Sequence, residues 1–104
     1  MKIFYIFLIL LGINIIADDF IVIDVRTPEE FNAGHIEESS NVEWEIISSI
    51  IDEVKKDQKI YLYCRSGRRS QKATDILIDL GYEDVTNLGG IKEAAIFLER
   101  NITE

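Results

Sequence analysis

The sequence has one cysteine, one histidine and one proline among its 104 residues. A lone cysteine excludes an internal disulfide and the Cys-x-x-Cys chemistry of disulfide oxidoreductases. One cysteine and one histidine do not complete a zinc site, so neither a metal nor any other cofactor is expected. Any thiol chemistry that this chain performs must therefore use Cys64 alone.

Positive charge is also scarce, with 11 basic against 19 acidic residues and a net charge of −8. This balance argues against a nucleic acid as partner. Three of the few arginines nevertheless gather directly after the cysteine, at Arg65, Arg68 and Arg69. Because the Debye length is about 8 Å at physiological salt, this cluster acts only on groups close to it. The length allows one domain.

The segment around Cys64 predicts a strand, a tight loop and a helix. Residues 60–64 form a short apolar and aromatic run that is typical of a buried strand. Beyond Ser70, apolar residues recur at helical spacing and a glycine follows at the expected C-terminal cap; these residues are Ala73, Ile76, Leu77, Leu80 and Gly81. Cys64 therefore lies where a strand ends and a helix begins, a place where α/β proteins bind anionic ligands.

This position favours a reactive thiolate. The amino end of a helix and the neighbouring arginines both stabilise a negative charge on the Cys64 sulfur. Gly67 lets the backbone turn so that several N–H groups point inward. In the alternative interpretation, Cys64 is a small buried apolar residue and the arginines form a solvated loop. The clustering of three arginines beside a cysteine at a strand end favours the reactive loop.

The remaining segments alternate between strand and helix patterns. Residues 20–23 predict a buried strand that ends at Asp24, and Thr27, Pro28 and Glu30 predict a capped helix start. An ion pair between Asp24 and Arg26 is expected to fix the intervening loop.

A second amphipathic helix is predicted over residues 44–55, with one apolar face made of Ile46, Ile47, Ile50, Ile51 and Val54. Residues 85–88 predict the last strand, and the final helix buries Ile91, Ala94, Ala95 and Leu98. Such alternation predicts an α/β fold with a mostly parallel central sheet and helices on both faces.

Residues 1–17 have the outline of a secretory signal peptide: Lys2, an apolar core over residues 3–16, and Ala17 before two aspartates. The core is shorter than the ~20 residues of a spanning helix. We expect cleavage after Ala17, which leaves a mature domain of residues 18–104 in the periplasm or otherwise exported, without a stable membrane anchor. The alternative is a leader that is retained as an anchor.

Four motifs in order resemble those of rhodanese-type sulfurtransferases. Residues 64–70 (Cys-Arg-Ser-Gly-Arg-Arg-Ser) are similar to the active-site loop of that family, and residues 23–31, 34–36 and 87–91 resemble its other segments. The match runs from about Phe20 to Ile91. It implies a rhodanese-like fold in a single rhodanese domain of the small, exported, phage-shock-associated type.

The resemblance also implies an activity, namely transfer of a sulfane sulfur from thiosulfate or a similar anionic donor to cyanide or a thiol. Cys64 would be the catalytic residue and would carry a persulfide. The resemblance assigns donor binding to Arg65, Ser66, Gly67, Arg68, Arg69 and Ser70. It makes Asp24, Arg26 and His35 structural supports near the site. A monomer is expected.

Two other functions remain open. Cysteine phosphatases and arsenate reductases resemble this loop, but they place an arginine six residues after the cysteine, where this chain has Ser70. A catalytically idle interaction module of the same fold is the second alternative, although such modules commonly lack the cysteine. A Cys–His pair between Cys64 and His35 is a third arrangement, which we consider less favoured than a structural histidine.

Overall fold

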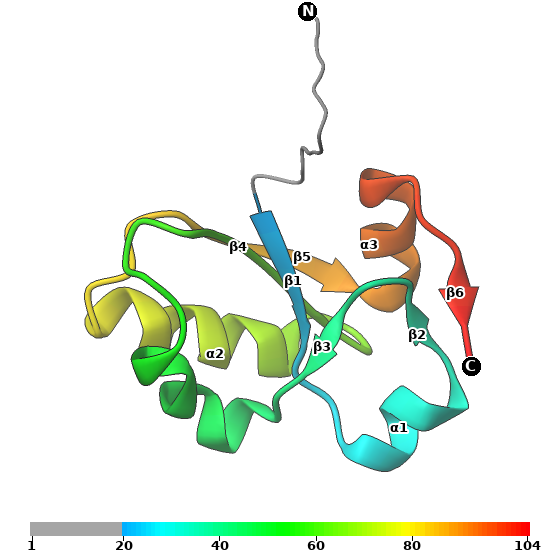
Figure 1. Ribbon diagram of the computed structural model, residues 1–104. Coiled ribbons are helices and arrows are strands. Elements are labelled where there is room, and N and C mark those ends of the chain that lie inside the picture. The colour runs from blue at the N-terminus through cyan, green and yellow to red at the C-terminus, as the bar shows by residue number, and fades with distance from the viewer. Residues whose placement is uncertain (1–19) are drawn as a thin grey trace, which may run out of the picture.

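The computed structural model describes residues 20–104, and the predicted leader, residues 1–17, lies outside the described residues. Within that range a four-stranded parallel sheet has the order β3-β1-β4-β5. Its strands are β1 (Phe20–Asp24), β3 (Ser40–Asn41), β4 (Lys59–Cys64) and β5 (Val85–Gly90). The other elements are α1 (Pro28–Ala33), β2 (His35–Ile36), η1 (Trp44–Asp52), α2 (Arg68–Asp79), α3 (Ile91–Leu98) and β6 (Ile102–Thr103) (Figure 1).

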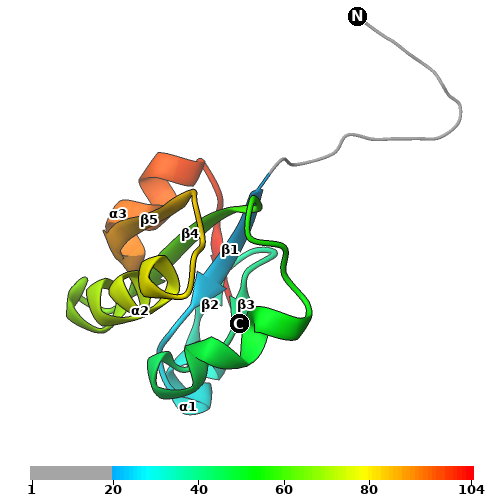
Figure 2. The same ribbon diagram turned by 90° about the vertical axis from the view of Figure 1, so that its left-hand side faces the viewer.

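Both faces of the sheet are buried, as the apolar strands predict. Alternate residues of β4 point to opposite sides: Ile60 and Leu62 join the core under η1 and α2, whereas Tyr61 and Tyr63 face α3. In Figure 2 the parallel strands run through the middle of the domain with the helices around them. The predicted α/β fold with helices on both faces is therefore confirmed.

Helix α2 follows the predicted pattern. Ala73 and Leu77 are fully buried against the sheet, with Ile76 and Leu80 packed beside them. Its carboxyl end closes with two hydrogen bonds, from Gly81 N to Ile78 O at 3.0 Å and from Tyr82 N to Leu77 O at 3.0 Å. This pair of bonds is the Schellman arrangement, and it ends the helix where the sequence predicts.

The helix predicted over residues 44–55 is wrong in type and length. The segment is a 3₁₀ helix over Trp44–Asp52 with non-helical backbone at Ile46. A 3₁₀ helix has three residues per turn, so Ile47 and Ile50 share the buried face, while Ile46 and Ile51 are 56% and 44% exposed. Several β-branched residues and two serines disfavour an α-helix here.

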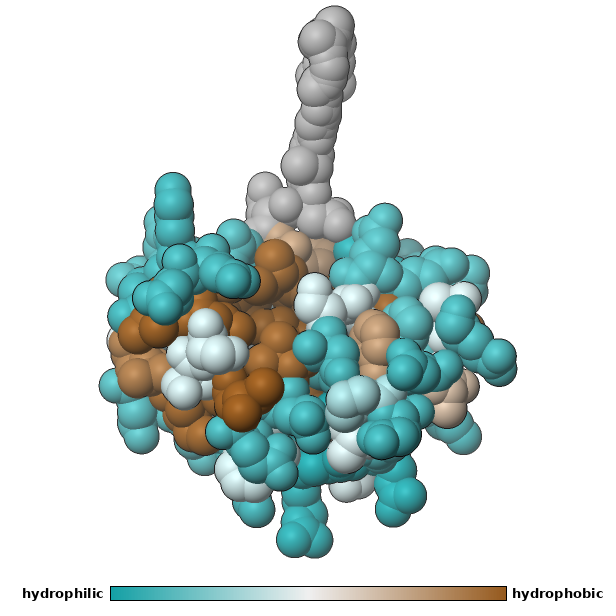
Figure 3. All heavy atoms as spheres, turned by 60° about the horizontal axis from the view of Figure 1, so that its bottom comes forward, coloured by the Kyte–Doolittle hydropathy of each residue, from teal (hydrophilic) through white to brown (hydrophobic). Residues whose placement is uncertain are grey.

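The isoleucines of η1 that point away from the core, Ile46 and Ile51, are part of an apolar surface. Figure 3 shows apolar side chains gathered on the left of the face that comes forward, where η1 lies, with hydrophilic side chains around them. None of the helices within residues 20–104 combines the length and the apolar character needed to cross a membrane.

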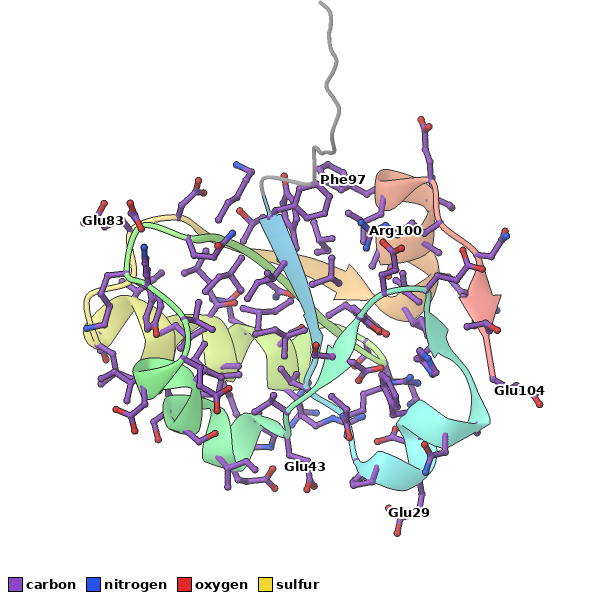
Figure 4. The ribbon with its side chains drawn as sticks, in the orientation of Figure 1. Glu29, Glu43, Glu83, Phe97, Arg100 and Glu104 are labelled. Atoms are coloured by element: carbon purple, nitrogen blue, oxygen red, sulfur yellow. The ribbon has the colours of Figure 1, made fainter. Side chains whose placement is uncertain are left out.

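Helix α3 packs on the other side of the sheet, where Ala94 is buried and Ile91, Ala95 and Leu98 line the core as predicted. Figure 4 places Phe97 and Arg100 near the start of β1, on the side of α3. The Phe97 ring meets Tyr61 edge to face, with centroids 5.4 Å apart. Strands β2 and β6, which the sequence pattern did not reveal, pair antiparallel at this side of the molecule.

Candidate active site

Cys64 ends β4 and lies at the entrance to α2. The residue is 1% exposed, and its Sγ accepts a hydrogen bond from the N–H of Gly67 at an N···S distance of 2.9 Å. Gly67 is the N-terminal cap of α2 and has φ +100°, a backbone conformation that side-chain-bearing residues rarely adopt. The chain therefore folds back on the sulfur immediately before the helix begins, as the sequence predicts.

Opposing effects act on the Cys64 thiol. Burial raises its pKa, because a thiolate loses hydration in the core. Hydrogen bonds lower the pKa more than burial raises it; they come from the Ser70 hydroxyl and from the N–H groups of Ser70, Ser66 and Gly67. The net result is a pKa below the usual range of a thiol. The loop thus favours the thiolate, which is the nucleophilic form of cysteine.

Gly89 and Gly90, the last two residues of β5, form the wall behind the loop. Gly90 lies opposite Cys64 in the strand register, and a Cβ on Gly90 would lie 2.6 Å from the carbonyl oxygen of Arg65. A Cβ on Gly67 would approach Gly89 Cα to 3.3 Å. The backbone of the cysteine loop therefore packs directly on the backbone of Gly89 and Gly90. This contact limits how far the loop can move away from the Cys64 sulfur.

Asn87 also supports the loop, a role that the sequence pattern did not reveal. Its Nδ2 donates to the carbonyl oxygen of Gly67 at 3.1 Å, and its Oδ1 accepts from the N–H of Gly89 at 2.9 Å. Asn87 therefore links Gly67 of the cysteine loop to Gly89 near the end of β5. A polar amide between Thr86 and Leu88, directly before the glycine pair, was the signal that could have identified it.

The three arginines predicted to bind the donor do not share one environment. Arg65 and Arg68 are exposed, and neither forms an ion pair with another residue in the described part of the chain. Arg69 instead forms a bidentate ion pair with Glu30 at the start of α1, with N–O distances of 2.8 and 3.0 Å. Arg69 is thus engaged in holding two elements together.

Glu30 is the centre of that link. It completes the predicted capping box by accepting from the backbone N–H of Thr27 at 3.0 Å, and Thr27 Oγ1 accepts from Glu30 N. The hydrogen bonds from Arg69 are the main cause that lowers the Glu30 pKa to about 2, with the Thr27 contacts adding to them against partial burial. Its carboxylate is therefore charged at neutral pH.

The loop after β1 lies beside the cysteine loop, because β1 and β4 are neighbours and the chain leaves them toward opposite edges of the sheet. Asp24 and Arg26 form the predicted ion pair, with an N–O distance of 2.7 Å, and both are buried. Asn41 Nδ2 donates to the carbonyl oxygens of both residues. These contacts join the loop after β1 to Asn41 of β3.

His35 is held by Phe31 through two contacts. Its Nδ1 lies 2.8 Å from Phe31 O, and its ring stacks on the Phe31 ring with centroids 3.7 Å apart. These contacts fit the structural role expected of this histidine. Within residues 20–104, no three His, Cys, Asp or Glu side chains are grouped so that they could hold a metal ion.

A buried cysteine at a strand end, surrounded by N–H donors at the start of a helix, defines an α/β protein with a thiolate-stabilising loop. A model of the family described as "Rhodanese-like domain" matches residues 13–95. The chain belongs to this family.

Individual proteins that resemble this chain have names that fit the same family. A "Sulfurtransferase" of Allochromatium vinosum is 37% identical over 74 residues, which cover 71% of this chain and 69% of that protein. "Thiosulfate sulfurtransferase PspE" of Escherichia coli is 34% identical over 76 residues, covering 71% and 73%. A solved structure described as "rhodanese with anions from E. coli" has a TM-score of 0.66 at 33% identity and covers 70% of this chain and 88% of that chain.

Proposed function

We propose that this protein is a sulfurtransferase that moves a sulfane sulfur from thiosulfate, or a similar anionic donor, to a thiophilic acceptor. The observation that carries the proposal is the Cys64 sulfur, which is buried against loop N–H groups and has a lowered thiol pKa. The names of relatives support the same reaction class, since one is a sulfurtransferase and another a thiosulfate sulfurtransferase.

The reaction has two displacements. The Cys64 thiolate attacks the outer sulfur of thiosulfate, the S–S bond of thiosulfate breaks, and sulfite leaves with the electron pair. Cys64 then carries a persulfide anion, which the N–H groups of the loop stabilise. Cyanide or a thiolate attacks the outer sulfur, departs as thiocyanate or a new persulfide, and restores the Cys64 thiolate.

The exposed arginines have a separate role in the proposal. Arg65 and Arg68 carry charge at the mouth of the loop without an acidic partner among the described residues, so they can attract the anionic donor and stabilise departing sulfite. Arg69 contributes less to binding, because its guanidinium is paired with Glu30.

Thiocyanate formation from thiosulfate and cyanide tests the proposal. The purified protein should form thiocyanate, and the Cys64→Ala variant should not. An aryl phosphate should remain intact under the same conditions, since Ser70 stands where the phosphatase pattern has arginine. Phosphate release that depends on Cys64 would favour the phosphatase, and an absence of both activities would favour the idle module.

A further inference from the structure

Asn87 reaches the reactive sulfur through a second residue. Besides the Gly67 and Gly89 contacts, its Oδ1 lies 2.6 Å from Ser70 Oγ, and its Nδ2 lies 3.1 Å from Gln71 Oε1. Ser70 is fully buried, and its Oγ lies 3.4 Å from Cys64 Sγ. A continuous contact therefore runs from the Asn87 amide through the Ser70 hydroxyl to the sulfur.

Two backbone groups fix the direction of the Asn87 amide. The N–H of Gly89 can only donate, so it requires the oxygen of the amide, and the carbonyl of Gly67 can only accept, so it requires the nitrogen. The group that faces Ser70 is therefore the carbonyl oxygen. Because a carbonyl oxygen has no proton, the short contact must be an O–H···O bond that Ser70 donates.

The Ser70 hydroxyl has one proton and two acceptors within reach. It can donate to Asn87 Oδ1 or to Cys64 Sγ, but not fully to both. When Cys64 is a thiol, its S–H can donate to Ser70 Oγ while Ser70 donates to Asn87. When the sulfur is an anion, it has no S–H to donate to Ser70 Oγ, and Ser70 can add a hydrogen bond to those of the loop N–H groups only if its hydroxyl turns away from Asn87.

We propose that Asn87 is a positioning residue of this site, which holds the Ser70 hydroxyl proton while Cys64 is a thiol and competes with the sulfur for that proton once the sulfur is an anion. This role rests on the proposed function, in which both a thiolate and a persulfide anion form on Cys64. It implies that Ser70 stabilises the anion less than an unconstrained hydroxyl would. The loop N–H groups then carry most of the stabilisation.

The test is the pH dependence of Cys64 alkylation by iodoacetamide in four proteins: the wild type, Ser70→Ala, Asn87→Ala and the double variant. In the protein with Asn87 intact, Ser70→Ala should raise the pH midpoint of Cys64 alkylation only slightly. In the Asn87→Ala background the same change should raise it by about one pH unit, the size expected for a hydrogen bond to a charged group. Equal shifts in both backgrounds would overturn the proposal, since a merely structural Asn87 leaves the Ser70 effect unchanged.

Two further variants control the measurement. Gln71→Ala removes exposed side-chain contacts with Asn87 and Asp75 and leaves the Ser70 contact of Asn87 in place, so the Ser70→Ala shift should stay as small as in the wild type. Asn87→Leu has a similar volume and no acceptor oxygen, so it replaces Asn87→Ala if that variant does not fold; the Ser70→Ala shift there should again be about one pH unit, and a shift as small as in the wild type would contradict the proposal. Alkylation needs no sulfur donor, so the result stands apart from thiocyanate formation, which tests the proposed function.

Discussion

At the level of single residues, the reactivity of Cys64 depends more on backbone than on side-chain charge. The sulfur is surrounded by N–H groups of the loop, whereas the guanidinium of Arg69 is bound to a carboxylate of another element. The sequence pattern treats the three arginines alike, because their spacing from the cysteine says nothing about which partner each one finds. The structure shows that their surroundings differ.

Substitution of single arginines should reveal this division. Arg68→Ala should raise the KM for thiosulfate roughly three- to tenfold, because one partly exposed charge-assisted contact is lost, and should leave stability almost unchanged. Arg69→Ala should lower the free energy of unfolding by about 1 kcal/mol through loss of the Glu30 pair, with a smaller effect on KM. Steady-state kinetics and urea unfolding measure the two effects.

The outcome that contradicts this division is specific. If Arg69→Ala raises KM as much as Arg68→Ala does and leaves the unfolding free energy unchanged, Arg69 releases Glu30 and binds the donor. Lys72→Ala serves as a matched control for loss of one positive charge on α2, since Lys72 lies over the Trp44 ring and not at the loop.

At the level of elements, the close contact between the end of β5, at Gly89 and Gly90, and the cysteine loop determines the shape of the site. Gly90→Ala places a Cβ 2.6 Å from the carbonyl oxygen of Arg65, so the loop must shift. We expect a rise in the pH midpoint of Cys64 alkylation and a fall in kcat/KM of at least about tenfold, because misaligned N–H donors stabilise the sulfur anion less.

Gly34→Ala is the matched control for the glycine prediction. There the added Cβ meets only Ile102 Cγ2 at 3.5 Å, an ordinary contact, so alkylation and turnover should stay near wild type. An unchanged pH midpoint of Cys64 alkylation in Gly90→Ala would show that the cysteine loop is not held against the end of β5.

The elements that sequence could predict are those with a clear period or cap. Strand β4 is a short continuous apolar run, helix α2 has apolar residues at spacings of three to four, and Thr27 with Glu30 forms a recognisable capping box. The 3₁₀ form of η1 was missed because its isoleucines fit an α-helical stripe equally well. Strands β2 and β6 have two residues each, too few for any period.

The site divides in the same way. Cys64 and its loop are contiguous in sequence, so their proximity could be predicted. The contacts of Glu30 and Asn87 with that loop join residues 39 and 17 to 20 positions apart, and no local pattern encodes them. They arise from the packing of α1 and β5 beside α2, which only the assembled fold provides.

At the level of the whole molecule, the link between α1 and α2 makes stability depend on pH. The Glu30 carboxyl has a pKa of about 2 in the folded protein against 4.5 ordinarily, so its contribution is complete above about pH 5 and is lost as the pH falls toward 2. The unfolding free energy should therefore fall over this range, and less steeply in Glu30→Gln. Urea unfolding at several pH values measures this; identical slopes would mean that the pair adds nothing.

We also propose that residues 1–17 direct export of the protein and are then cleaved off, which leaves residues 18–104 as the mature domain. The charged start, the short apolar core and Ala17 support this proposal. Expressed in a Gram-negative host, the protein should occur in the periplasmic fraction with Asp18 as its first residue. N-terminal sequencing that finds Met1 on membrane-bound protein would favour a retained anchor.

The proposed reaction requires Cys64 to carry the transferred sulfur, and intact-protein mass spectrometry can detect that sulfur. The chain has no second cysteine, so in the proposed reaction the transferred sulfur is held as a persulfide on this residue. Incubation with thiosulfate alone should add the mass of one sulfur atom, cyanide should remove it, and Cys64→Ala should never acquire it. A wild-type protein that forms thiocyanate without any cyanide-reversible mass addition would contradict the account.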